Sequence, residues 1–92
     1  PATTVRVDFT ITGLIYDETT NIEQIKEDFT KAVKAIYAEA KKEGILRYND
    51  VRPIISDIAG VEDFDTFLMD GDMKNLRLSN EEYPETGALN FS

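Results

Sequence analysis

Hydrophobic and polar residues alternate strictly in one early stretch of the chain, from Thr3 to Thr12. A period of two puts successive side chains on opposite faces of an extended strand. The stretch is therefore predicted to form a half-buried β-strand with a polar outer face. Gly13 ends the alternation, a second apolar patch follows at Leu14–Tyr16, and residues 17–20 are expected to form a loop. The predicted inner face of the strand consists of Val5, Val7, Phe9 and Ile11.

The next segment places an apolar residue at every third or fourth position, which is the spacing of one face of an α-helix. Either Thr20 or Asn21 can cap its start, because Thr20 with Glu23 and Asn21 with Gln24 both fit a capping box. Gly44 is expected to end the helix after about 20 residues, or roughly 30 Å. The predicted buried stripe is Ile22, Ile25, Phe29, Val33, Ile36 and Ala40.

A second, shorter helical stripe follows a connector at residues 45–48. Asn49 or Asp50 is expected to cap this helix, and Pro53 fits its first turn, where a missing N–H is tolerated. Gly60 is expected to end it. The predicted inner residues are Val51, Ile54, Ile55 and Ile58.

The last third of the chain predicts short strands. Residues 61–69 are expected to form one strand, and the Asp70-Gly71 turn is expected to lead into a returning strand at 76–78, which makes a hairpin. The acidic, proline-containing segment 80–86 is interpreted as a loop, and 87–91 as an edge strand. The fold class is therefore α+β, in the order strand, long helix, short helix, strand, strand. We expect one domain over residues 1–92, with a small mixed or antiparallel sheet and both helices packed on one face.

Composition narrows the functional classes. The formal net charge is -8, from 18 acidic and 10 basic residues with no basic block. Nucleic acids and anionic membrane surfaces both require clustered lysine and arginine, so neither is an expected partner. The chain has no cysteine and no histidine, which removes disulfides, thiolate chemistry and the commonest proton carrier and metal ligand. We therefore expect no enzyme.

The remaining motifs with possible chemistry fit their patterns poorly. A calcium loop starting at Asp70 fails at its fifth and sixth positions, which are Lys74 and Asn75. Paired carboxylates are expected by chance among 18 acids, and no serine has a histidine to activate it. We expect no catalytic residue, no cofactor and no metal ligand.

Several apolar and tyrosine side chains are more hydrophobic than their predicted loops and element ends require. Tyrosine suits an interface, because its ring can be dry while its hydroxyl stays wet. The alternative is that these side chains only close the edges of a small core. The candidate contact residues are Leu14, Tyr16, Tyr83, Leu89 and Phe91.

Short stretches across the chain resemble the C-terminal domain of the phage baseplate J-like family, which includes baseplate proteins of contractile tails and of PBSX-type prophages. The alternating strand comes before the long helix, as it does in that family. The other matching stretches are Gly44-Ile45, Tyr48-Asn49-Asp50-Val51, Ile54-Ile55, Ala59-Gly60-Val61, Leu76-Arg77-Leu78, Glu82-Tyr83-Pro84 and Gly87-Ala88-Leu89.

The resemblance implies a structural component of a phage or prophage tail baseplate, at the C-terminal end of a longer protein. It implies contacts with other baseplate proteins, self-association in a ring, and a place in the virion tail after assembly in the bacterial cytoplasm. The alternative is a small-molecule-binding regulatory domain of ferredoxin-like type. Such domains repeat a strand-helix-strand unit, whereas this chain predicts two consecutive helices.

Overall fold

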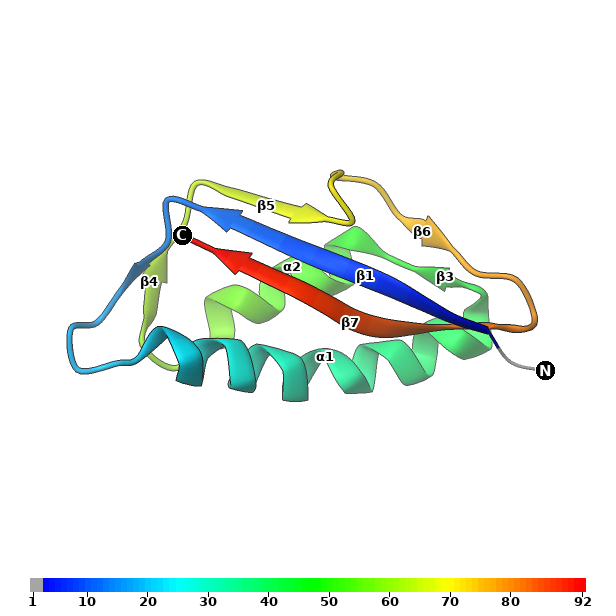
Figure 1. Cartoon of the computed structure of the whole chain (residues 1–92), viewed down its shortest axis with the longest axis horizontal. Coiled ribbons are helices and arrows are strands. Elements are labelled where there is room, and N and C mark those ends of the chain that lie inside the picture. The colour runs from blue at the N-terminus through cyan, green and yellow to red at the C-terminus, as the bar shows by residue number, and fades with distance from the viewer. Residues whose placement is uncertain (1–2) are drawn as a thin grey trace.

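The computed structural model describes residues 3–92, which form two layers, a twisted sheet and a pair of helices (Figure 1). The main sheet has three strands: β1 (Thr3–Thr12) in the centre, β5 (Thr66–Met69) on one side and β7 (Glu82–Phe91) on the other. β5 runs antiparallel to β1, and β7 runs parallel to it. Both helices, α1 (Ile22–Glu43) and α2 (Tyr48–Asp57), cover the same face of this sheet. The α+β class, the mixed sheet and the placement of the helices are confirmed.

The core lies between the sheet and α1. Val7, Phe9 and Ile11 of β1 are fully buried, as their alternation predicted. Phe29 of α1 sits at the centre of an aromatic cluster. Its ring centroid lies 5.0 Å from that of Phe9, 6.1 Å from that of Phe67 and 5.7 Å from that of Phe91.

The long helix follows its sequence signals closely. Of the two predicted caps, the structure selects Asn21, whose Oδ1 accepts a hydrogen bond from the Glu23 N–H at 2.8 Å. Gln24 does not complete a capping box, because its side chain donates to Asp28 instead. Gly44 ends the helix with a φ of 74°, a conformation that glycine adopts at little steric cost.

The predicted cap of the second helix is wrong. α2 begins at Tyr48, so Asn49 and Asp50 lie inside its first turn, and the cap residue Arg47 makes no side-chain capping bond. The acceptor comes instead from a distant segment, where Oδ1 of Asn75 takes the Tyr48 N–H at 2.9 Å. Local sequence could not show this, because the two residues meet only in the folded chain.

The predicted strand 61–69 is two strands with different partners. β4 (Val61–Asp63) pairs with β2 (Ile15–Tyr16), a short strand within the predicted apolar patch, whereas β5 pairs with β1. Between them the Asp65 N–H donates to the Thr12 carbonyl at 2.9 Å, so the chain changes partner there. This change explains why the segment has no single hydrophobic phase.

The Asp70-Gly71 turn is present, but the predicted hairpin is wrong. Both residues have positive φ, 56° and 77°, and Met69 and Asp72 exchange backbone hydrogen bonds of 2.8 and 3.1 Å across the turn. The returning strand β6 (Leu76–Arg77) does not pair with β5. It pairs antiparallel with β3 (Ile45–Leu46), inside the predicted connector, where Leu46 is fully buried.

The predicted loop 80–86 is also wrong from Glu82 onward, because β7 runs from Glu82 to Phe91. Pro84 is compatible with this strand because β7 lies at the edge of the sheet, where one missing N–H breaks no ladder. The expected edge strand 87–91 is therefore only the second half of a ten-residue strand.

Candidate interaction surface

The five predicted contact residues lie at different depths. Tyr16 and Tyr83 are 37% and 41% exposed, and Leu14 and Leu89 are partly buried against the core. Phe91 is only 8% exposed and packs edge-on against Phe29, so it belongs to the hydrophobic core.

These residues do not form one patch. The Leu14 N–H donates to the Ser92 carbonyl at 2.9 Å, so Leu14 lies beside the C-terminal end of β7. Tyr83 pairs with Thr4 at the opposite end of the same strand. The fold therefore separates the predicted contacts into two groups at the two ends of the sheet (Figure 1).

Two exposed apolar side chains were missing from the sequence-based set. Ile15 is 53% exposed and Met73 is 57% exposed. Ile15 belongs to the apolar patch that the sequence showed, but only the structure shows that it faces solvent more than its neighbour Tyr16. Met73 gives no sequence signal, since it is one apolar residue in a polar turn.

A shallow groove of about 350 Å³ lies between α1 and β7. At the groove the Tyr37 hydroxyl and the Thr86 hydroxyl are 2.7 Å apart and share a hydrogen bond. Burial raises the pKa of Tyr37, the nearby Glu85 carboxylate adds to this, and the Thr86 bond opposes it. The groove is lined by Thr30, Lys34, Tyr37, Tyr83, Pro84, Glu85 and Thr86.

The first part of the β7 edge is closed to another strand. The Lys41 ammonium of α1 donates to the carbonyls of Asn80 and Glu82 at 2.8 and 2.9 Å, and Pro84 has no N–H to offer. A proline on an edge strand, and cover of that edge by a neighbouring element, are common devices against strand addition. Contacts near Tyr83 therefore have to use side chains.

The other end of the molecule is built by β2 and β4. Ile15 pairs with Asp63 and Tyr16 pairs with Val61, and the Asp17 N–H donates to the Gly60 carbonyl at 2.8 Å. Asp17 also accepts bonds from the backbone N–H and the hydroxyl of Thr19, which lower the pKa of its carboxyl. This end therefore has a fixed backbone and a carboxylate that keeps its charge.

Over residues 3–92, no group of three or more acidic side chains is close enough to hold a metal ion. Within the same residues, neither helix is both long and apolar enough to cross a membrane. Every buried side-chain nitrogen or oxygen in this part of the chain has a hydrogen-bond partner.

The fold and its surfaces define a two-layer α+β domain that presents exposed apolar side chains and a shallow groove. The sequence profile of the baseplate J-like protein C-terminal domain family matches residues 7–92. The match covers the two-layer core almost completely, so this chain belongs to the baseplate J-like protein C-terminal domain family. The family has a structural role in the phage tail baseplate and is not known for enzymatic activity. No curated protein sequence matches the chain.

Proposed function

We propose that this domain is an assembly module of a phage or prophage tail baseplate, that it binds other baseplate proteins, and that it self-associates in a ring. The family match over residues 7–92 carries this proposal. We further propose that the chain is a single domain at the C-terminal end of a longer protein.

The surface supports a role in protein contacts. Tyr16 and Tyr83 keep large parts of their side chains in solvent, and Leu14 and Leu89 lie partly open beside the core. Aromatic residues that are half-buried before binding are typical anchors of protein interfaces. Phe91 would contribute indirectly, by holding the strand that presents Leu89.

The proposal is tested by removing the domain from the full-length gene in a host that produces the tail particles. We expect tails without complete baseplates in electron micrographs, because an assembly contact would be lost. A full-length protein with Tyr16→Ser and Tyr83→Ser together should show a partial form of the same defect. Complete baseplates after removal of the domain would contradict the proposal.

The alternative, a small-molecule-binding regulatory domain of ferredoxin-like type, would use the α1–β7 groove. Its volume is near the lower limit of ligand pockets, about 300 Å³. A thermal-shift screen of metabolites tests this alternative. A rise of several degrees with one compound, lost in Tyr37→Phe, would favour it.

A further inference from the structure

Ile15 and Tyr16 are adjacent large apolar residues on β2, and they are 53% and 37% exposed. Single exposed apolar residues are ordinary on protein surfaces. Here two lie at adjacent positions of one short strand, where successive side chains point to opposite faces. Both faces of β2 therefore carry an exposed apolar side chain that the fold does not explain, since the core is already filled by seventeen other buried side chains.

The backbone that carries these two residues is held at several points. β2 pairs with β4, the Asp17 N–H donates to the Gly60 carbonyl, and the Asp65 N–H donates to the Thr12 carbonyl. Gly13 packs so closely on Asp65 that an added Cβ would lie 2.3 Å from Oδ2 of that carboxylate. The strand backbone therefore holds both side chains in a preorganised position, which lowers the entropy cost of binding.

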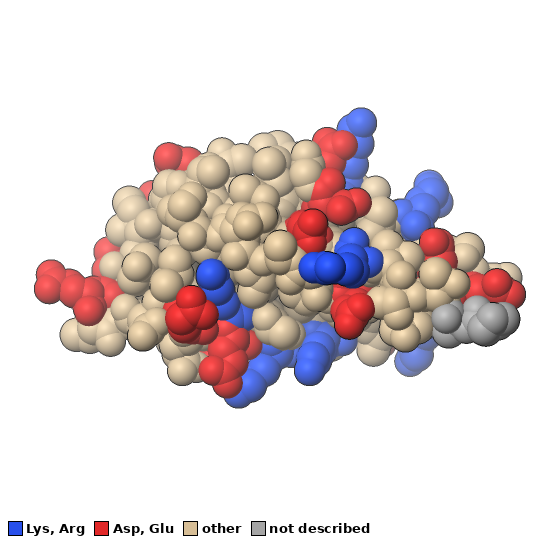
Figure 2. All heavy atoms as spheres, viewed as in Figure 1, with Lys and Arg blue, Asp and Glu red and all other residues tan. Residues whose placement is uncertain are grey.

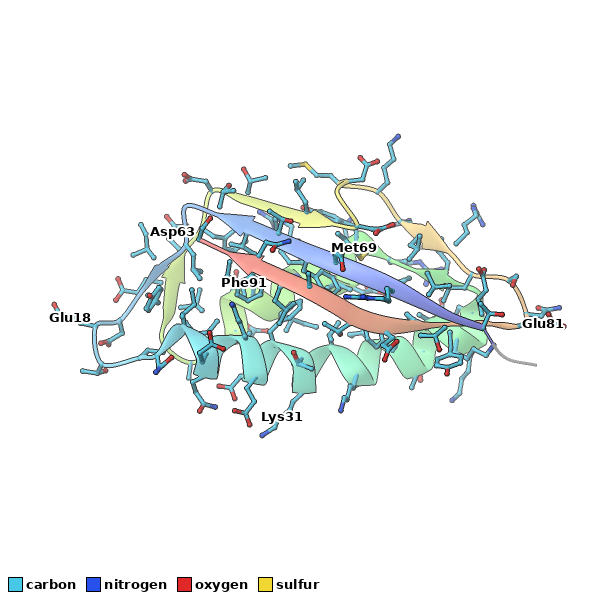
Figure 3. All side chains as sticks on the ribbon, viewed as in Figure 1. Glu18, Lys31, Asp63, Met69, Glu81 and Phe91 are labelled. Carbon is cyan, nitrogen blue, oxygen red and sulfur yellow. The ribbon has the colours of Figure 1, made fainter. Side chains whose placement is uncertain are left out.

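The charge around this surface has one sign. Segments 12–25 and 53–66 build this end of the molecule and contain no lysine or arginine. Asp63 lies directly opposite Ile15 in the strand ladder, and its carboxylate is exposed. Figure 2 shows acidic side chains at this end of the visible face, and Figure 3 shows Glu18 and Asp63 at the same end. The acidic residues of the two segments are Asp17, Glu18, Glu23, Asp57, Glu62, Asp63 and Asp65.

The two nearest basic residues in sequence are already engaged. Lys26 lies 3.8 Å from the Glu23 carboxylate, and the Arg52 guanidinium lies over the Phe64 ring at 5.4 Å from its centroid. The seven carboxylates of the two segments outnumber these two cations, so the field around Ile15 is negative and would repel the same end of a second copy.

We propose that the β2–β4 end of this domain, centred on Ile15 and Tyr16, binds a different protein of the assembly through a surface with an apolar centre and a rim of lysine or arginine. This inference rests on the proposed assembly function and specifies one surface and the chemistry of its partner. The apolar pair supplies buried area, and the carboxylates select a basic rim.

The occupant is identified by placing the photo-reactive residue p-benzoylphenylalanine at position 15 of the full-length protein and irradiating assembled tails. We expect an adduct with a different protein, on a peptide flanked by lysine or arginine. The matched control is the same photo-reactive residue at position 73, because Met73 is 57% exposed but lies outside the acidic segments, and it should not give that adduct. An adduct only with a second copy of this chain, or no adduct from position 15, would overturn the proposal.

The role of charge is tested with the double variant Glu18→Lys and Glu62→Lys. Its copy number per tail, measured by quantitative mass spectrometry, should fall about tenfold. The matched control is Glu27→Lys with Glu39→Lys on the exposed face of α1, which should leave the copy number unchanged. Both purified variants should melt within a few degrees of the wild type, which separates lost binding from lost folding.

Equal incorporation of the two charge variants would overturn the inference and leave the assembly function intact. Failure of the assembly function itself gives a different result, because tails that lack the whole domain would then still carry complete baseplates.

Discussion

At the scale of single residues, polar side chains accept backbone N–H groups at helix starts and strand irregularities. Asp8 is one example, because its carboxylate accepts the Ala88 N–H of β7 at 2.8 Å. Asn75 is another, since it supplies the missing cap of α2. Such bonds join segments that are far apart in the chain, and each satisfies a donor that would otherwise be unpaired.

Replacing Asn75 with alanine should lower the free energy of unfolding by about 1 kcal/mol, because the Tyr48 N–H loses its acceptor at the start of α2. Urea denaturation measures this. The matched control is Asn49→Ala, which removes the residue that local sequence favours as the cap and should change the stability by less than about 0.5 kcal/mol. A larger loss from Asn49→Ala than from Asn75→Ala would contradict the assignment.

We predict that the folded protein loses stability in alkali because Tyr37 ionises. Its pKa is raised in the folded protein by burial, so above the ordinary value of 10.0 the unfolded chain loses the proton first. The stabilisation is complete below about pH 10 and disappears as the pH rises through the higher folded pKa. Denaturation midpoints from pH 8 to 11 should therefore fall more steeply for the wild type than for Tyr37→Phe. Parallel profiles for the two proteins would count against a folded-state shift.

At the scale of elements, a bulge in β7 sets which side chains enter the core. Val7 pairs with Thr86, but Phe9 pairs with Leu89, so β7 has one extra residue opposite Asp8. Before the bulge the inward residues are Pro84 and Thr86, and after it they are Leu89 and Phe91. The bulge therefore changes the hydrophobic phase of the strand in its middle.

Asp8 and Gly87 should be energetically coupled at this bulge. A Cβ at Gly87 would lie 2.1 Å from Oδ1 of Asp8, so Gly87→Ala has to displace the carboxylate that accepts the Ala88 N–H. Asp8→Ala and Gly87→Ala should each lower the free energy of unfolding by about 1 kcal/mol. The double variant should cost clearly less than the two together, which a double-mutant cycle measures. If the stability losses of the two single variants simply add in the double variant, Gly87→Ala does not act through the Asp8 carboxylate.

Elements with a regular hydrophobic period were predicted correctly from the sequence, whereas β7 was predicted only in part. Thr3–Thr12 and the Asn21–Gly44 helix carry regular periods and local caps, and the structure confirms both. β7 gives no regular period, because its bulge changes the phase and its partner β1 is about eighty residues away in the chain. β4 and β5 were predicted as one strand for a related reason. β4 pairs with β2 and β5 pairs with β1, and the sequence of a strand does not show which strand it pairs with.

At the scale of the whole molecule, the parallel pairing of β1 and β7 joins the two ends of the described chain into one elongated body, with principal extents of 44 × 21 × 18 Å. One face of the sheet is covered by helices (Figure 1). Of the predicted contact residues, Tyr16 and Tyr83 are open to a partner, while Leu14, Leu89 and Phe91 also hold the body together.

This distinction gives opposite expectations for two aspartate substitutions on one strand. Phe91→Asp should cost more than about 3 kcal/mol and abolish cooperative melting, because it buries a charge beside Phe29. Tyr83→Asp should melt within a few degrees of the wild type, since the residue is 41% exposed and lies outside the buried core. Circular dichroism melting curves of the two variants test both expectations. A cooperative, wild-type-like transition in Phe91→Asp would contradict the core assignment.

The sequence by itself determined the elements that depend on neighbours a few residues apart: the first strand, the long helix and its end at Gly44, the Asp70-Gly71 turn and the α+β class. It also carried the motifs that place the chain in its family. Only the tertiary structure decided the parallel partner of β1, the division of 61–69, the distant cap of α2 and the exposure of Ile15. These features depend on contacts between residues far apart in the chain. Each backbone N–H and C=O needs a hydrogen-bond partner, and only the folded chain determines which distant group is close enough to be that partner.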